Sequence, residues 1–213
     1  MIVNERIVDY INSLDRGNGP LIDGIEREAK KNHVPIIRKE MSAFLKTLIT
    51  AKQPERILEV GTAVGYSALI MGQVMPEHCR ITTIEKFQPR IVAAKENFKR
   101  AGQEDRICLL EGDAQEILKE LEGPFDFIFM DAAKGQYIHW LPVILKLMPK
   151  GGILVSDNVL REGGIVESRY AVERRDRTIH KRMREYLFEL THNDSLQTSI
   201  IPIGDGAAVS VKC

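Results

Sequence analysis

Between residues 56 and 157 the chain alternates short apolar segments with longer amphipathic ones, and this alternation constrains its fold more than any other feature. The short segments are rich in β-branched and aromatic residues, as buried strands are. The intervening stretches have helical length, which parallel strands need for their crossover connections. We therefore expect a mostly parallel sheet covered by helices on both faces. The predicted strands are RILEVG (56–61), RITTIE (80–85), RICLLEG (106–112), FDFIFMD (125–131) and GILVSD (152–157).

The two ends of the chain follow different patterns. The first 52 residues predict helices, because apolar residues recur there at helical spacing. Near the C-terminus a charged helix over about 172–192 precedes two short strands that flank the sequence GDG. Such a turn is typical of a hairpin, so one strand near the edge of the sheet should run antiparallel. We expect a single α/β domain, with N-terminal helices over 1–52 and a Rossmann-like core over 53–213.

Composition, charge and cysteine spacing limit which partners and which compartment the sequence favours. The chain has 213 residues, with 30 basic and 30 acidic ones, so no global field selects an anionic or cationic partner. A nucleic-acid site would need a local basic patch. Cys79, Cys108 and Cys213 have the spacing of neither a disulfide framework nor a zinc site, which favours a reducing cytoplasm. We expect no secretory leader and no membrane-spanning segment.

Acidic side chains stand at the end of every predicted strand. Glu59, Glu85, Asp113, Asp131 and Asp157 come at or just after these ends. Ligands of open α/β sheets bind beyond the carboxyl ends of the strands. Carboxylates gathered at one edge repel one another unless a cation or a ligand rich in hydrogen-bond donors lies among them. The sequence therefore predicts a ligand site at this edge.

The sequence EVGTAVGYS (59–67) places Gly61 and Gly65 on the first strand-to-helix turn, where glycine permits a tight turn and the close approach of a ligand. Glu85, which ends the next strand, could accept the hydroxyls of a ribose. The glycine spacing differs from that of dinucleotide and P-loop motifs, which favours a nucleoside without phosphates. The alternative is an ordinary strand-to-helix turn beside a surface acid.

Asp131, Asp157 and Asn158 supply oxygen donors from the ends of two adjacent predicted strands. Such donors, without His or Cys, suit Mg²⁺ or Ca²⁺ and less exclusively Mn²⁺. The alternative is that Asp157 and Asn158 only begin a loop. Lys134 follows Asp131 by three residues. It could act as a base with a lowered pKa, hold an oxyanion while charged, or be an ordinary solvated lysine.

A basic segment follows the last of these oxygen donors. We expect an insert over about 161–184 at the mouth of the site, where it could neutralise RNA phosphates. The alternative is the exposed face of a charged helix. The candidate RNA-binding residues of this insert are Arg169, Arg174, Arg175, Arg177, Lys181 and Arg182.

Taken together, these segments resemble the cation-dependent O-methyltransferases that use S-adenosylmethionine, a family that includes the catechol and caffeoyl-CoA enzymes. The resemblance runs from about residue 33 to the C-terminus. It implies a Rossmann-like, seven-stranded methyltransferase sheet with one antiparallel strand near the C-terminal edge. It rests on the segments ILEVGTAVGYSA, IE at 84–85, GDA at 112–114, MDAAKGQY, SDNVL and IPIGDG.

The resemblance also implies a role for each matching residue. Lys134 would be the catalytic base, and Asp131, Asp157 and Asn158 would bind the metal, with Asp131 also beside the cofactor. The remaining residues would surround S-adenosylmethionine: Glu59, Gly61, Gly65 and Ser67 at its methionine part, Glu85 at the ribose, Asp113 and Ala114 at the adenine, and Ile37 from the N-terminal helices.

Within the family, the segments HVPI, QPERILEVGTAVGYSA and DAAKGQY and the Arg-rich insert are similar to the bacterial tRNA 5-hydroxyuridine methyltransferases. Ala133 stands where the catechol enzymes place an aromatic residue, and Val159 and Leu160 stand where the caffeoyl-CoA enzymes have a tryptophan. The similarity implies Mg²⁺-dependent methylation of wobble 5-hydroxyuridine to 5-methoxyuridine, with the tRNA anticodon stem-loop as partner. Relatives also suggest a homodimer. The alternatives are a small catechol-like or caffeoyl-type diol as acceptor, and a non-catalytic adenosine- or RNA-binding protein.

Overall fold

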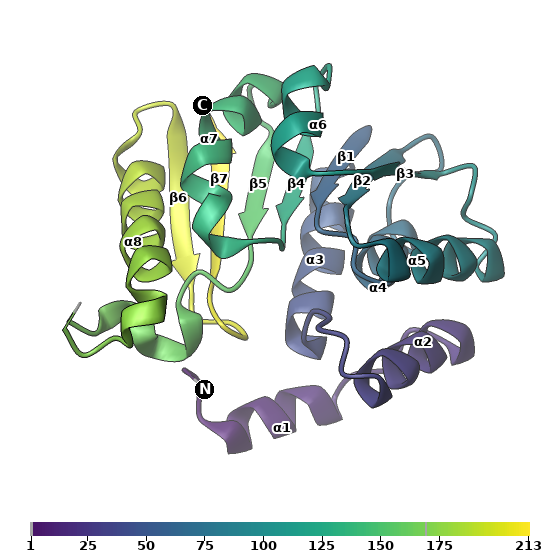
Figure 1. Cartoon of the computed structure of the whole chain (residues 1–213). Coiled ribbons are helices and arrows are strands. Elements are labelled where there is room, and N and C mark those ends of the chain that lie inside the picture. Colours follow the sequence, from purple (N-terminus) through teal and green to yellow (C-terminus); the bar gives the residue numbers. More distant parts are fainter. Residues whose placement is uncertain (1, 169) are drawn as a thin grey trace.

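The computed structural model describes residues 2–168 and 170–213. Its centre is a seven-stranded sheet with the strand order β3-β2-β1-β4-β5-β7-β6 (Figure 1). The first five strands are parallel, and β7 is antiparallel to both of its neighbours, β5 and β6. The predicted mixed sheet with one reversed strand near its edge is confirmed. The strands are β1 (Arg56–Val60), β2 (Arg80–Glu85), β3 (Ile107–Glu111), β4 (Phe127–Met130), β5 (Ile153–Ser156), β6 (Leu196–Ile201) and β7 (Ala207–Lys212).

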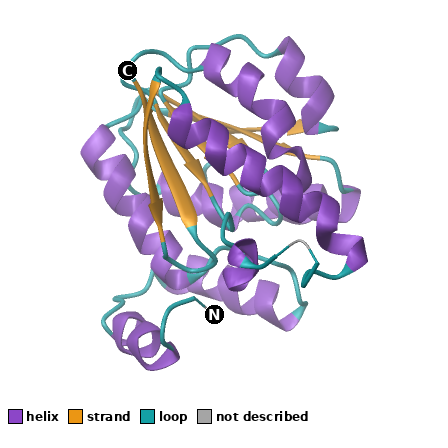
Figure 2. Cartoon of the chain, turned by 90° about the vertical axis from the view of Figure 1, so that its left-hand side faces the viewer, coloured by secondary structure: helices purple, strands orange, loops and turns teal. Residues whose placement is uncertain are grey.

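Each central strand is buried on both sides because helices cover both faces of the sheet (Figure 2). Ile57 and Leu58 of β1 are both fully buried, yet they belong to two separate cores. One core includes side chains of α2 to α5, and the other includes side chains of α6 to α8. These helices are α2 (Pro20–Lys31), α3 (Lys39–Lys52), α4 (Tyr66–Gly72), α5 (Gln88–Arg100), α6 (Ala114–Glu120), α7 (Tyr137–Leu147) and α8 (Arg177–His192).

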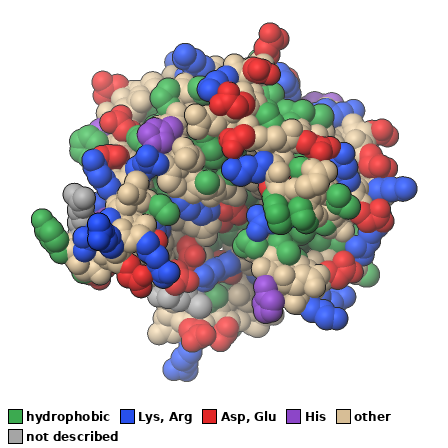
Figure 3. Space-filling model, in the orientation of Figure 1, with side chains coloured by type: hydrophobic (Ala, Val, Ile, Leu, Met, Phe, Trp, Pro, Cys, Tyr) green, Lys and Arg blue, Asp and Glu red, His purple; other side chains and the backbone are tan. Residues whose placement is uncertain are grey.

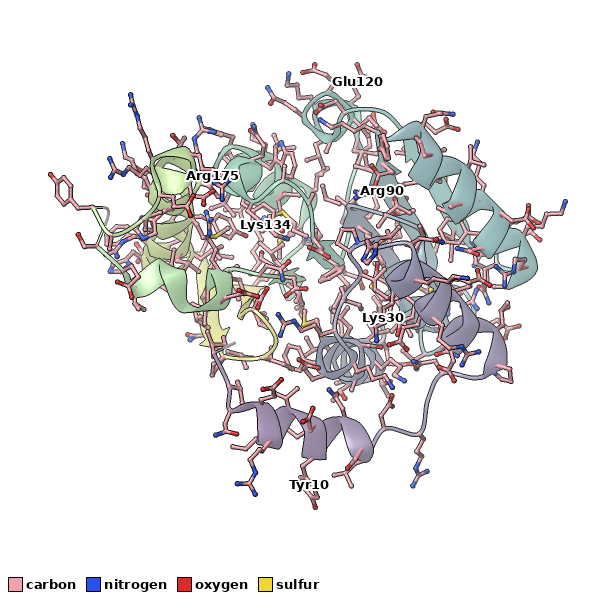
Figure 4. All side chains as sticks on the ribbon, turned by 60° about the horizontal axis from the view of Figure 1, so that its bottom comes forward. Tyr10, Lys30, Arg90, Glu120, Lys134 and Arg175 are labelled. Carbon is pink, nitrogen blue, oxygen red and sulfur yellow. The ribbon has the colours of Figure 1, made fainter. Side chains whose placement is uncertain are left out.

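The N-terminal helices differ in how they pack. Helix α3 buries Met41, Leu45 and Ile49 in the first core. Helix α1 (Glu5–Ser13) buries no residue, although its apolar side chains lie along one face. Tyr10 points away from the rest of the chain in Figure 4 and is 66% exposed. The fold therefore leaves the apolar face of α1 open to solvent.

The turn between β6 and β7 holds the loop that follows β5. The Val159 and Leu160 amides donate hydrogen bonds to the carbonyl oxygens of Gly206 and Asp205, each at 2.9 Å. Gly206 has φ +88°, and a Cβ there would lie 2.2 Å from Leu160 Cγ, so only glycine fits. The GDG sequence thus forms the predicted hairpin turn and also fixes the loop that begins at Asp157.

The predicted charged helix over about 172–192 is shorter than expected. A 3₁₀ turn, η3 (Arg174–Asp176), precedes α8, which begins at Arg177. Two other 3₁₀ turns flank the site: η1 (Lys134–Gln136) and η2 (Arg161–Val166). Arg169, one of the candidate RNA-binding residues, lies outside the described residues. In the described part of the chain, every helix is too short or too polar to cross a bilayer.

Candidate active site at the carboxyl ends of the strands

A cavity of about 930 Å³ opens beyond the carboxyl ends of the parallel strands. Figure 3 shows a hollow on this face of the molecule, with acidic and basic side chains around it. The strand order brings the ends of β1, β2, β4 and β5 to the same wall, as predicted. Nine of the residues assigned from the sequence line the cavity: Ile37, Gly61, Glu85, Asp113, Ala114, Asp131, Lys134, Asp157 and Asn158.

Glu59, Gly65 and Ser67 lie outside the lining of the cavity, so the structure gives them a supporting position. Glu59 is fully buried and accepts a hydrogen bond of 2.5 Å from Thr83 Oγ1. Burial raises the pKa of Glu59 to about 7, although hydrogen bonds from Ser67 and Thr83 oppose this. This residue therefore anchors the end of β1 to β2, and its direct contact with a cofactor stays a prediction.

Gly61 allows β1 and β4 to approach each other at the floor of the cavity. Its φ is +109°, and a Cβ there would lie 2.1 Å from the Asp131 carbonyl oxygen. Gly65 has φ +82°, and the Phe98 ring occupies the space that its Cβ would need. Both glycines of the predicted motif are thus required by the backbone and by the close packing around the turn.

The Glu85 carboxylate is fixed by backbone amides at the floor of the cavity. Its Oε2 accepts from Ala63 N at 3.0 Å, and its Oε1 accepts from the amides of Lys86 and Phe87, each at 3.0 Å. Three fixed donors hold the group in one orientation, while Oε2 keeps a lone pair for a ligand hydroxyl. This arrangement is suited to binding a ribose.

Asp113 lies beside the end of β2, between β3 and α6, where it caps the helix. Its carboxylate accepts from Gln115 N at 2.9 Å and from Lys86 Nζ at 3.2 Å. These two hydrogen bonds, the backbone one first, lower the pKa of Asp113. The carboxylate therefore stays ionised, while the neighbouring Ala114 presents a methyl group to the cavity.

Asp131 and Lys134 form an ion pair at the other end of the cavity. Lys134 Nζ lies 2.5 Å from Asp131 Oδ1 and 3.3 Å from the Tyr137 hydroxyl. Burial opposes the charge of the lysine, but Tyr137 and Asp131 outweigh it and raise the pKa of Lys134. The lowered pKa considered from the sequence is therefore not seen, and the structure holds this side chain as an ammonium ion.

The Tyr137 hydroxyl fixes the turn that carries this pair. It donates to the Met130 carbonyl oxygen at 3.0 Å and accepts from Ala132 N at 3.1 Å. Tyr137 is fully buried, so the turn between β4 and η1 is tied down from below. Asp131 and Lys134 are thereby presented to the cavity at a fixed separation.

The donors of Asp131, Asp157 and Asn158 fit a hard divalent cation. Burial, followed by the negative charge of Asp131, raises the pKa of Asp157 to about 7. The two carboxylates are therefore close enough to repel each other, and a cation between them would relieve this repulsion. Asp157 Oδ1 also accepts from Asn158 N at 2.7 Å, with Asn158 in the left-handed region at φ +58°.

The chemistry of this donor set narrows the choice of metal. Among the described residues there is no cluster of three or more His, Cys, Asp or Glu side chains with the arrangement of a metal site. The set instead combines two carboxylates with one carboxamide, all of them oxygen donors. This composition suits Mg²⁺ and leaves coordination positions for water and substrate.

Several charged residues line the cavity that the sequence analysis did not assign to it. Arg38 Nη2 lies 2.8 Å from Asp205 Oδ1 and 3.6 Å from Glu162 Oε1. These contacts join the start of α3 to the β6–β7 turn and to η2. Asp205 belongs to the IPIGDG segment, so this motif could have indicated from the sequence that Asp205 lies at the site. The unassigned charged or polar residues also include Lys86, Arg90, Gln115, Gln136 and Arg161, and Trp140 adds an aromatic wall.

The basic insert lies beside the end of the cavity that holds Asp131 and Lys134. Arg174, Arg175 and Lys181 are exposed. Figure 4 places Arg175 on the same side of the molecule as Lys134, with Arg90 on the other side. Arg182 donates to the Gly135 carbonyl oxygen at 3.2 Å, which ties α8 to η1.

Arg177 is also partly structural, because its Nε donates to the Val172 carbonyl oxygen at 3.1 Å. The exposed cations of the insert and its structural arginines are therefore different residues.

Comparison with known proteins shows which family the chain belongs to. The model of the O-methyltransferase family matches residues 16–213. The chain is 36% identical to the catechol O-methyltransferase of Niastella koreensis over 128 residues, a match that spans 58% of each protein. A candidate caffeoyl-CoA O-methyltransferase from Staphylococcus aureus superposes with a TM-score of 0.89 at 29% identity, covering 96% of this chain and 98% of the other.

A second solved structure was determined with S-adenosylhomocysteine (SAH) bound. The SAH-bound methyltransferase PaMTH1 of Podospora anserina superposes with a TM-score of 0.87 at 25% identity, covering 99% of this chain and 97% of the other. The match of the family model covers nearly the whole sequence, and the cavity lies where this fold binds its ligands. The chain therefore belongs to the O-methyltransferase family.

Proposed function

We propose that this protein transfers the methyl group of S-adenosylmethionine to the 5-hydroxyl of 5-hydroxyuridine at the wobble position of tRNA. The observation that carries this proposal is the single cavity that joins the fixed Glu85 carboxylate to the group of Lys134, Asp131 and Asp157. One end is suited to a nucleoside and the other to a hydroxyl acceptor. A donor and an acceptor bound there would lie in the same cavity.

The donor would occupy the half of the cavity formed by β1, β2 and β3. Glu85 would accept from a ribose hydroxyl, and Asp113 and Ala114 would lie at the adenine. Gly61 would allow the methionine part to approach the backbone, and Ile37 would cover it from the N-terminal side. The SAH-bound Podospora relative supports this choice of donor.

The acceptor would occupy the half formed by β4, β5 and the β6–β7 turn. Asp131, Asp157 and Asn158 would hold Mg²⁺, which when bound supplies Lewis-acid stabilisation of the acceptor oxygen. Lys134 lies where its ammonium group can hold the negative charge that develops on the acceptor oxygen, while the hydroxyl proton passes to solvent. The oxygen forms its bond to the methyl carbon as the carbon–sulfur bond breaks, and alignment of the two reactants lowers the barrier.

Two features favour an RNA acceptor. Arg175 lies on the same side of the molecule as Lys134 (Figure 4), and it could contact phosphates of the anticodon stem-loop together with the exposed Arg174 and Lys181. Ala133 lines the cavity just before Lys134, and its small side chain leaves room for a base that has left its stack. The test is methylation of tRNA from cells lacking this protein. We expect 5-methoxyuridine to form only with S-adenosylmethionine and Mg²⁺.

A small diol is the second candidate acceptor, because the Niastella koreensis relative is a catechol O-methyltransferase. Catechol and 5-hydroxyuridine both present two neighbouring oxygens, so the same residues could serve either. Parallel assays with hypomodified tRNA and with caffeate or catechol separate the two. Methylation of the diol alone would overturn the RNA proposal and leave the O-methyl transfer chemistry intact.

A further inference from the structure

The cations that line the cavity differ in how well they are neutralised. Arg38, Lys86 and Lys134 each have a carboxylate oxygen within 3.2 Å. Among the described residues, Arg161 forms an ion pair with Asp176 alone, with 3.7 Å between Arg161 Nη2 and Asp176 Oδ1. Arg90 forms no ion pair within the described ranges, but it lies on α5, in the donor half. Arg161 is thus the weakly paired cation of the acceptor half.

The position of Arg161 points to a ligand. It follows Asn158 by three residues, and its side chain lines the same cavity. Its backbone has φ +49°, a left-handed conformation that is unfavourable for a non-glycine residue. Its Nη1 is buried and, among the described residues, has no hydrogen-bond partner. Backbone strain and an unsatisfied buried donor commonly occur together where a protein binds a ligand.

The chemistry of Arg161 selects an anion with more than one oxygen. A guanidinium presents paired N–H groups that match a phosphate, and such charge-assisted bonds are stronger than neutral ones. Because Nη1 is covered, the group would have to turn from Asp176 toward the cavity. Because the contact to Asp176 is long and weak, rotating the side chain away from it costs little free energy. A neutral catechol offers no such anion, whereas a nucleotide carries one beside its base.

We propose that Arg161 binds the 5′-phosphate of the nucleotide whose base is methylated. The inference rests on the proposed function, because it assumes that the base lies at Lys134, Asp131 and Asp157. The loop that begins at Asp157 would then contact the acceptor at both ends, with its oxygen donors at the base and Arg161 at the phosphate. Recognition of this phosphate would separate an RNA acceptor from a free diol.

The test compares 5-hydroxyuridine with 5-hydroxyuridine 5′-monophosphate. Each is titrated by calorimetry into protein saturated with S-adenosylhomocysteine, at one fixed Mg²⁺ concentration. We expect the monophosphate to bind about 10- to 100-fold more tightly than the nucleoside, the range of one charged hydrogen-bonded contact. Arg161→Gln should remove this preference and leave nucleoside affinity unchanged. Arg161→Lys, which keeps the charge without the paired donors, should retain part of it.

Arg90→Gln is the matched control, because it removes the other weakly paired cation of the cavity from the donor half. It should leave the preference for the monophosphate intact. Equal affinity of the unmodified protein for both compounds, or full preference in Arg161→Gln, would contradict the role of Arg161 alone. Failure of both compounds to bind, with catechol methylated, would contradict the proposed acceptor itself. An unchanged thermal unfolding midpoint in each variant establishes that it is folded.

Discussion

Lys134 Nζ lies 2.5 Å from Asp131 Oδ1, so the ammonium and the carboxylate at the tip of β4 form one unit. The buried Tyr137 hydroxyl fixes the turn between them. A strand that is otherwise apolar therefore ends in a charged pair because the pair faces the cavity, beside Asp157. This arrangement leads to the first two predictions.

Replacing Lys134 with Met should lower kcat about 10²- to 10³-fold, the usual cost of removing one donor that stabilises developing negative charge. Affinity for S-adenosylhomocysteine should change little, because the donor half lies at Glu85 and Asp113. Single-turnover kinetics and calorimetry on the same preparations measure the two effects. Lys146→Met, at an exposed position on α7, is the control. Full activity in Lys134→Met would remove this residue from the mechanism.

Chelation with EDTA should abolish methyl transfer, and added Mg²⁺ should restore it. Asp157→Asn should weaken Mg²⁺ binding, because it removes one of two carboxylates that share the site. The measurement is activity as a function of free Mg²⁺, together with Mg²⁺ titration of the protein alone. Asp126, a carboxylate at the opposite edge of the sheet, supplies the control as Asp126→Asn. Activity that survives exhaustive chelation contradicts a metal-dependent reaction.

Charge reversal of the exposed arginines, as Arg174→Glu with Arg175→Glu, should raise KM for tRNA and leave the KM for 5-hydroxyuridine unchanged. The salt dependence of tRNA binding should also decrease, with a slope of log affinity against log salt smaller by about 1 to 2. Filter binding at several salt concentrations measures this. The matched control is Lys146→Glu with Lys150→Glu, two exposed cations near the amino end of β5. Equal losses in both double variants would indicate a general charge effect.

Glu59 should make stability depend on pH. Its pKa is raised by burial from 4.5 to about 7, so the folded state binds its proton more tightly than the unfolded state does. This contribution to stability is fully present below pH 4.5 and is lost as the pH rises to about 7. The loss should approach about 3 kcal/mol.

Glu59→Gln should abolish that component of the pH dependence. Urea unfolding at pH 5 and pH 8 measures the difference between the two proteins. Glu104→Gln, an exposed carboxyl on a loop, is the control and should behave as the unmodified protein does. If unmodified protein and Glu59→Gln lose the same stability between these pH values, the buried carboxyl is already ionised when folded.

The exposed face of α1 supports the expected homodimer. Ile7, Tyr10, Ile11 and Leu14 are each at least 47% exposed and recur at helical spacing. We propose that a second copy of the chain covers this face, because such a contiguous apolar surface is unusual on a monomer. Tyr10→Asp with Leu14→Asp should yield monomers in light scattering. Val92→Asp, an exposed apolar position on α5, should leave the oligomeric state unchanged.

The sequence predicted those parts of the site that follow directly from where the buried strands end. Buried strands end where the apolar run stops, so the sequence alone places Glu85, Asp131 and Asp157 at one edge of the sheet. The loops could not be placed in this way. Arg38 and Asp205 are 167 residues apart, and their 2.8 Å contact depends on the full strand order. The weak pairing of Arg161 likewise depends on the position of η3, which no local pattern specifies.

Under the proposed function, the sheet order would assign the two reactants to different strands. The donor half is built on β1, β2 and β3, whereas the acceptor half is built on β4, β5 and the β6–β7 turn. Changes in the segment after β5 can therefore exchange one methyl acceptor for another without disturbing the binding of the donor. Relatives that methylate different acceptors would then be expected to differ most in this one segment.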